Sequence, residues 1–155
     1  MEKIIAKAPI TLELVKKINK LLCRGTIDER QYKINQERAG EFKKQDYVVE
    51  IHEVGSTAEK VEADLTALLE EIQEYSGNRC LTAAAYLHCR FESIHPFSDG
   101  NGRTLLNYYL MAKNLPSLIL DDENQNVYYE VLLVYDEQKD VEAMRTFIEF
   151  SLIKT

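Results

Sequence analysis

The chain has 155 residues, of which 45% are hydrophobic and 29% are charged, and its net charge is −7. This length and composition predict one soluble globular domain over residues 1–155, with its core over about 11–153. The negative charge argues against nucleic acid as the main partner, because binding backbone phosphates requires a basic face. No apolar run reaches the roughly 18 residues that span a membrane, and residues 1–10 are too short and too polar for a signal peptide.

The cysteines are odd in number and do not follow the spacing of a metal site. They are Cys23, Cys80 and Cys89. Reduced thiols are the ordinary state of cysteines in the cytoplasm, so we expect a cytoplasmic protein with free thiols.

The first part of the chain predicts one helix and one strand. Apolar residues recur at helical spacing over 11–23, and Gly25 is suited to end that helix. Residues 24–45 are mostly polar and predict irregular structure, whereas 47–51 is rich in β-branched and aromatic residues and predicts a strand. A single short strand is not stable alone, so we expect it to have a partner.

The rest of the chain predicts helices with short connections. Ser56-Thr57-Ala58-Glu59 has the pattern of a capping box and predicts the start of a helix that ends near Gly77. Repeated apolar stripes with short loops indicate an all-α bundle with a small β element. Further helices are predicted over 81–94, 101–113, 126–135 and 141–153.

Residues 95–103, His-Pro-Phe-Ser-Asp-Gly-Asn-Gly-Arg, are the most informative stretch of the chain. The imidazole of His95 ordinarily titrates near pH ~6.5, so it can take a proton from an attacking hydroxyl. Asp99 offers the single carboxylate that Mg²⁺ accepts beside waters and phosphate oxygens. These residue types indicate phosphoryl or nucleotidyl transfer, with His95 as the catalytic base and Asp99 as the metal ligand.

The second half of this stretch is suited to binding an anion. Gly100 and Gly102 flank Asn101 at the start of a predicted helix, and glycine lets backbone N–H groups converge on phosphate oxygens. Arg103 adds a planar, permanent positive charge for a second phosphate. We therefore interpret Gly100, Asn101, Gly102 and Arg103 as nucleotide-binding residues.

Several residues also fit structural roles. Asp99 is well placed to cap the helix that follows it, which is the common use of Asp at such a position. We interpret His88 as a buried, hydrogen-bonded histidine that supports the loop, and Phe97 as a core side chain that fixes it. Lys43 and Lys44 are interpreted as solvated lysines rather than as contacts of a target or nucleotide.

The stretch 95–103 resembles the signature of the Fic family, best known for transferring AMP from ATP to hydroxyl side chains of other proteins. The resemblance covers roughly 11–150 and implies a Fic-fold helical bundle with a small β-hairpin flap. It also implies ATP–Mg²⁺ as the substrate and a target protein with a Ser, Thr or Tyr acceptor. Residues of the flap that it assigns to target docking are Tyr47, Val48, Val49 and Ile51.

The chain departs from the fuller Fic pattern at Leu106, where that pattern has a second arginine. In one alignment, about three residues have been lost after Arg103 or Thr104. In the other, 103–107 aligns without a gap to the Doc branch, which resembles Arg-Thr-Ala-Leu-Asn there, lacks this arginine and transfers phosphate. Doc carries a lysine where this chain has Gly102, so the sequence combines features of both branches.

Three functions follow from this resemblance. We expect a Fic-type protein adenylyltransferase, whose activity the missing arginine can reduce. The alternatives are a Doc-like protein phosphotransferase and a degenerate Fic domain that binds nucleotide or protein without turnover. Fic enzymes are often restrained by a Ser/Thr-x-x-x-Glu-Gly/Asn motif, which this sequence does not contain. Any restraint would therefore come from a separate small antitoxin-like protein or from low intrinsic activity.

Overall fold

The computed structural model of the chain describes residues 9–24, 38–49, 52–75, 79–97 and 102–153. Within these ranges it contains six helices and a two-stranded sheet, so the predicted all-α bundle with a small β element is confirmed. The elements are α2 (Leu12–Leu22), β1 (Tyr47–Val49), β2 (His52–Val54), α4 (Val61–Gln73), α5 (Cys80–Ile94), α6 (Gly102–Ala112), α7 (Gln125–Gln138) and α8 (Glu142–Ile153).

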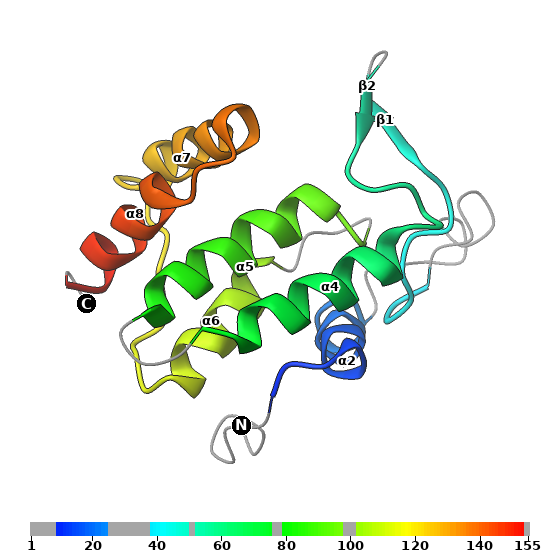
Figure 1. Cartoon of the computed structure of the whole chain (residues 1–155), viewed down its shortest axis with the longest axis horizontal. Coiled ribbons are helices and arrows are strands. Elements are labelled where there is room, and N and C mark those ends of the chain that lie inside the picture. The colour runs from blue at the N-terminus through cyan, green and yellow to red at the C-terminus, as the bar shows by residue number, and fades with distance from the viewer. Residues whose placement is uncertain (1–8, 25–37, 50–51, 76–78, 98–101, 154–155) are drawn as a thin grey trace.

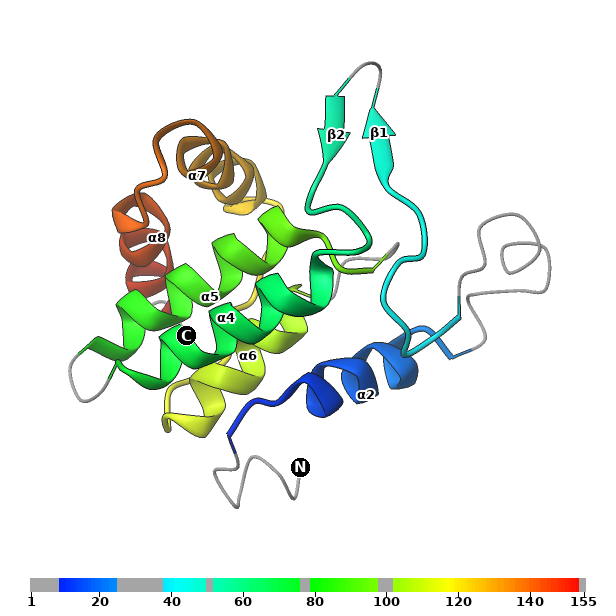
Figure 2. The same ribbon diagram turned by 45° about the vertical axis from the view of Figure 1, so that its right-hand side comes forward.

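Helix α5 is the central element of the bundle. It contacts α4, α6, α7 and α8, which surround it in Figure 1 and Figure 2, while α2 packs against α4 and α6. The run Ala83 to Ala85 in its first half is fully buried. Because alanine side chains are small, the neighbouring helices can approach this part of α5 closely.

The apolar stripes of the helices meet in one core. Each fully buried leucine, isoleucine or methionine contributes about 1.5–3 kcal/mol relative to an exposed one. This packing holds the end of α5 and the start of α6 in place, and the residues of the signature connect these two helices. Core side chains that are at most 2% exposed include Leu65, Leu68, Leu87, Phe91, Leu105, Leu106, Leu110, Met144 and Ile148.

The predicted start of α4 is wrong. The capping-box pattern over 56–59 does not open a helix, and α4 begins only at Val61 and ends at Gln73. The reason is that Ser56 has tertiary partners: its N–H donates to the carbonyl of Ile94 (2.9 Å) and its hydroxyl donates to Asp64 (2.5 Å). By contrast, α2 begins where the periodicity places it, with Thr11 as its N-cap.

The strand predicted over 47–51 belongs to a hairpin. β1 pairs antiparallel with β2, with Tyr47 opposite Val54 and Val49 opposite His52. Figure 2 shows this hairpin projecting from the helical body between α7 and α2. The expected β-hairpin is confirmed over Tyr47–Val49 and His52–Val54, whereas Ile51 lies outside the described residues.

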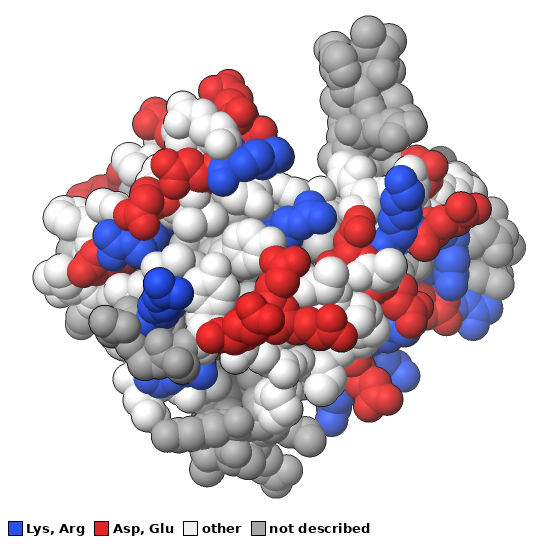
Figure 3. Space-filling model, viewed as in Figure 1, with Lys and Arg blue, Asp and Glu red and all other residues white. Residues whose placement is uncertain are grey.

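The visible charge is mainly acidic on one side of the bundle. In Figure 3, acidic side chains gather over α4, where Glu62, Glu70, Glu71 and Glu74 are exposed. Lys and Arg side chains are also visible on this face, scattered among the acidic ones (Figure 3). In the described ranges, no helix is both long enough and apolar enough to cross a lipid bilayer.

Candidate active site at the end of helix α5

His95 is the residue at which α5 ends. Its backbone is left-handed (φ 51°, ψ 63°), and its N–H donates to the carbonyl of Phe91 at 3.0 Å. This is the usual geometry of a helix C-cap, although the position is more often filled by glycine or asparagine. The chain therefore turns sharply at His95, and the side chain is left half-buried rather than packed in the core.

Phe97 lies in the core directly after this turn. It is 3% exposed, and its ring centroid lies 5.4 Å from that of Phe42 and 6.5 Å from that of Phe91. The two contacts connect the turn to α5 and to the segment that leads into β1. Phe97 is thus placed where a side chain that fixes the loop would lie, and that role remains a prediction.

Both flanks of the hairpin are attached to the turn. Before β1, the N–H of Lys43 donates to the carbonyl of Pro96 at 2.8 Å, and after β2, the N–H of Ser56 donates to the carbonyl of Ile94 at 2.9 Å. Gly55 has φ +81°, and a Cβ atom there would lie 2.5 Å from the Ile94 carbonyl oxygen and 2.7 Å from the Cβ of His95. Only glycine fits this contact, so the hairpin is held directly beside His95.

The surroundings of His95 favour its neutral form. Burial lowers the pKa of His95 from its ordinary value, and the nearby positive charge of Lys43 lowers it further. The imidazole is therefore mostly unprotonated at neutral pH, which is the state required of a residue that accepts a proton.

Lys43 is not the solvated lysine that the sequence suggested. It is only 4% exposed, whereas Lys44 is exposed and forms an ion pair with Glu41 at 3.5 Å. The bond from Lys43 to Pro96 and the contact of Phe42 with Phe97 draw this segment inward. The prediction was wrong because nothing in the local sequence distinguishes the two lysines.

The start of α6 faces the same end of α5. Gly102 is buried, and a Cβ atom at this position would overlap the carboxylate of Glu92 and lie 3.2 Å from Cε1 of His88. Arg103, the next residue, is exposed. Three other residues predicted to bind metal or nucleotide, Asp99, Gly100 and Asn101, lie outside the described residues.

His88 lies on α5 about two turns before His95, inside the bundle. It is 1% exposed, and its Nε2 is 2.7 Å from the hydroxyl of Tyr128 on α7. Burial lowers the pKa of His88 to about 4, opposed by the backbone of Gly102 and assisted by the charge of Arg103. The imidazole of His88 therefore bonds to α7 through Nε2 and lies against Gly102 at the start of α6, while its Nδ1 has no hydrogen-bond partner among the described residues.

Comparison with known proteins identifies the fold and family. The Fic/DOC family model matches residues 9–110. The chain belongs to the Fic/DOC family. A Fic domain containing signaling protein from Bacteroides thetaiotaomicron superposes with a TM-score of 0.76 at 21% identity, covering 99% of this chain and 63% of that one. Fic-1 from C. elegans superposes with a TM-score of 0.70 at 21% identity, covering 92% of this chain and 41% of that one.

Curated relatives of this Fic chain carry an activity in their names. "Protein adenylyltransferase Fic" from Aedes aegypti is 40% identical over 70 residues, which are 43% of this chain and 13% of that protein. The protein of the same name from Drosophila persimilis is 32% identical over 96 residues, which are 56% of this chain and 18% of that protein. The chain thus spans less than a fifth of the length of these relatives.

Leu106 distinguishes this Fic chain from the two-arginine pattern. Its side chain is fully buried in the core on α6. The position that the fuller pattern fills with a second arginine therefore faces the interior here, three residues after the exposed Arg103.

Glu92 lies beside Gly102, a predicted nucleotide-binding residue, and sequence reasoning did not single it out. Its carboxylate reaches the first residue of α6, Gly102. Burial raises its pKa, the charge of Arg103 opposes that rise, and Asp136 on α7 adds to it. The available signal was its spacing, because Glu92 follows His88 by four residues and so lies on the same face of α5.

The described part of this Fic chain contains no group of three or more His, Cys, Asp or Glu side chains arranged to hold a metal. Such a group is not needed for Mg²⁺ that binds together with a nucleotide, because this ion usually takes one or two carboxylates and completes its shell with waters and phosphates. Asp99, the predicted ligand, is outside the described ranges.

Proposed function

We propose that this chain is a protein adenylyltransferase that moves AMP from ATP to a Ser, Thr or Tyr hydroxyl of a target protein. One observation carries the proposal: the half-buried His95, kept neutral and held between the two flanks of the hairpin, is followed by Arg103 at the start of α6. The names of the curated relatives support the same activity.

In the proposed reaction, His95 accepts the proton of the target hydroxyl. The hydroxyl oxygen then forms a bond to the α-phosphorus of ATP, the bond from that phosphorus to the β-phosphate oxygen breaks, and pyrophosphate leaves. The proton remains on His95 until solvent removes it. A positioned base of this kind contributes about 10²–10⁴-fold to the rate, and positioning of the two substrates contributes the rest.

The nucleotide phosphates are proposed to bind at the start of α6. Backbone N–H groups of a helix N-terminus attract anions, and glycines leave room for close approach. Arg103 is exposed and free of the core, so its guanidinium is accessible to a phosphate. The residues proposed for this role are Gly100, Asn101, Gly102 and Arg103. Asp99 would hold Mg²⁺, which when bound neutralises charge on the phosphates.

The target is proposed to bind along the hairpin. In the described residues, β1 and β2 form a two-stranded sheet, so each strand has an edge without a partner strand. An extended segment of the target can pair with the edge of β1 by β-augmentation. Because both hairpin flanks are bonded to 94–96, such a segment would present its hydroxyl near His95.

A second candidate function is protein phosphorylation of the Doc type. The alignment without a gap favours it, because this alignment requires no deletion, and the burial of Leu106 agrees with a position that lacks the second arginine. In that case the γ-phosphorus rather than the α-phosphorus would be attacked.

ATP labelled at either phosphate separates these functions. The chain is incubated with Mg²⁺ and a cell extract as the source of acceptors, and His95→Asn is the matched control. Label transferred from the α-phosphate, and lost in the control, supports adenylyl transfer. Label transferred only from the γ-phosphate would contradict adenylyl transfer and support protein phosphorylation. Binding of ATP without transfer of either label would indicate a binding module.

We also propose a cytoplasmic location and an inhibitor supplied in trans. The three cysteines are free thiols, as expected for a reducing compartment.

A small antitoxin-like protein would have to cover Arg103 or the edge of β1 in order to block the reaction. Co-purification of such a protein, and loss of its binding when Arg103 is replaced by Gln, would test the second proposal.

A further inference from the structure

A cavity of about 560 Å³ lies at the end of the bundle away from the signature, where α4 and α6 end and α5 begins. Figure 2 shows the start of α5 on the side of the molecule away from the hairpin. Because a helix rises about 1.5 Å per residue, the 15 residues of α5 separate the cavity from His95 by roughly 20 Å. The cavity is therefore distinct from the proposed active site, and its volume is that of a small-molecule site.

Much of the cavity is lined by apolar side chains. Ile10, Leu69 and Ile72 line it and are at most 8% exposed, and Ala112 lines it at the end of α6. Water gains little from such a surface, whereas an apolar group gains from leaving water to contact it. The body of a ligand that fits this cavity is therefore apolar.

A buried hydroxyl without a partner lines the same cavity. Tyr109 on α6 is 6% exposed, and within the described part of the chain its hydroxyl has no hydrogen-bond partner. Such a hydroxyl costs stability, and buried tyrosine hydroxyls usually find a partner. Burial raises the pKa of Tyr109 to about 12, so the hydroxyl is protonated at neutral pH and can donate. A ligand with an acceptor oxygen would satisfy it.

The charge of the lining favours an anion. Lys113 lines the cavity directly after α6, and its Nζ lies 5.6 Å from the centroid of the Tyr109 ring. The described lining residues include no aspartate or glutamate, although the chain contains 26 of them. A cation and a hydroxyl donor on the same ring therefore face the cavity without a competing carboxylate, and charge-assisted bonds to an anionic oxygen are the stronger kind.

We propose that this cavity binds a small amphipathic carboxylate, with its apolar body between the ends of α4 and α6 and its carboxylate on the Tyr109 hydroxyl and the Lys113 ammonium. Binding is non-covalent. The inference is independent of the proposed function, because no residue of the signature takes part in it.

The test is calorimetric titration of the full chain with decanoate, which should saturate one site and raise the melting temperature. Lys113→Gln should weaken binding by about tenfold, because a charge-assisted contact is lost. Lys139→Gln is the matched control and should bind as the wild type does. Lys139 also lies over a tyrosine, with its Nζ 5.3 Å from the centroid of Tyr135, but it is not among the lining residues.

The uncharged decanol tests whether the cation recognises the head of the ligand. Decanol should bind the wild type about tenfold more weakly than decanoate does, and this difference should largely disappear in Lys113→Gln. An equal preference for decanoate in both proteins would overturn the assignment of the carboxylate to Lys113.

Two variants test the cavity itself. Tyr109→Phe should weaken decanoate binding by about three- to tenfold, yet it should not lower the melting temperature of the free protein, because its hydroxyl has no partner to lose. Ala112→Leu fills part of the cavity and should weaken binding by at least about tenfold, while leucine preserves the helix.

Cys80 provides a reporter that does not depend on heat or affinity. It lines the cavity and is partly exposed, whereas Cys23 and Cys89 are buried. Saturating decanoate should slow the alkylation of Cys80 by iodoacetamide, measured by mass spectrometry. The inference would be overturned by the absence of saturable binding, by unchanged binding in a folded Ala112→Leu protein, or by unchanged alkylation of Cys80 at saturation.

Discussion

The two histidines of α5 occupy contrasting regions of the molecule. His88 lies in the interior, 1% exposed, with its Nε2 against the Tyr128 hydroxyl at 2.7 Å. His95 lies at the end of the same helix, half-buried beside the hairpin. The pKa of each is lowered, mainly by burial and further by a nearby cation, which is Arg103 for His88 and Lys43 for His95.

This difference separates a structural histidine from a reactive one. A fully buried imidazole with a fixed partner stays neutral, but solvent and substrate cannot reach it. A half-buried imidazole with a lowered pKa remains accessible and can accept a proton. A lowered pKa alone therefore does not identify a base, and the exposure of the imidazole is needed as well.

The largest effect is expected on activity at His95. His95→Asn should reduce α-label transfer by about 10²–10⁴-fold, because the base is lost. Asparagine tolerates the left-handed backbone of this position, so the melting temperature and the affinity for ATP should change little. Steady-state label transfer measures the rate, calorimetric titration measures the affinity for ATP, and a melting curve measures the stability. Transfer at the wild-type rate would remove the distinction between the two histidines.

A large effect on stability is expected from the interior region. Leu106→Arg places a charge in the core and should destabilise the fold by about 3 kcal/mol or more, without strengthening ATP binding. Leu106→Met, which conserves volume, is the control and should cost less than about 1.5 kcal/mol. Urea unfolding compares the two. A stable Leu106→Arg protein with tighter ATP binding would mean that this position reaches the nucleotide after all.

A pH effect is expected from His88. Its pKa is lowered from 6.5 to about 4 in the folded protein, so between these values the unfolded chain binds the proton and the folded chain does not. Stability should therefore fall as the pH is lowered through this range, by up to about 3 kcal/mol. Glu92, whose pKa is raised, acts in the opposite sense.

The control for this effect is His88→Gln. The variant should be less stable at pH 7 but should lose less stability between pH 6.5 and about 4, because the titrating group is absent. Urea unfolding at several pH values measures the two slopes. Parallel curves for the two proteins would show that His88 is not kept neutral by the fold.

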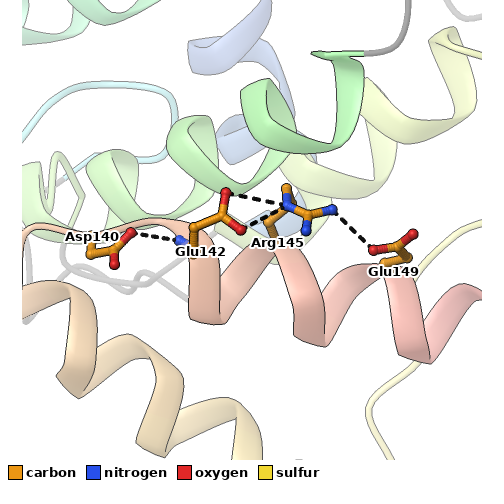
Figure 4. Close-up of polar contacts among 4 residues, drawn as sticks. All are labelled: Asp140, Glu142, Arg145 and Glu149. Carbon is orange, nitrogen blue, oxygen red and sulfur yellow. Dashed lines mark hydrogen bonds and ion pairs between the residues drawn. The ribbon is translucent and has the colours of Figure 1, made fainter.

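The smallest effect is expected at a surface ion-pair group on α8. Figure 4 shows Arg145 on α8 between Glu142 and Glu149, with nitrogen–oxygen distances of 3.1 Å and 3.0 Å, and Asp140 accepting the N–H of Glu142. Arg145→Gln should leave transfer unchanged and shift the melting temperature little, because exposed ion pairs are screened by water and salt. A loss of transfer in this variant would show that general destabilisation reduces activity, and would weaken the interpretation of His95→Asn.

Prediction from sequence succeeded where the signal is local. The helical periods located α2, α5, α6 and α8 to within one or two residues, and the β-branched run located β1. The capping box failed at Ser56, because a short polar pattern also serves tertiary partners such as Ile94 and Asp64. The structure brings His95, Phe97 and the β1 flank together, while Asp99, Gly100, Asn101 and Ile51 lie outside the described ranges.

The sequence by itself determined the helical bundle, the strand that begins at Tyr47 and the order of chemical groups from His95 to Arg103, because periodicity and motif spacing depend on neighbours along the chain. The hairpin was implied by the resemblance to the Fic family. Tertiary structure alone decided that Lys43 is buried and Lys44 is not, that His88 meets Tyr128, and that Leu106 faces the core. Burial of a polar or charged group depends on which distant segment packs against it. That segment is here the turn after α5, which no local pattern near residue 43 encodes.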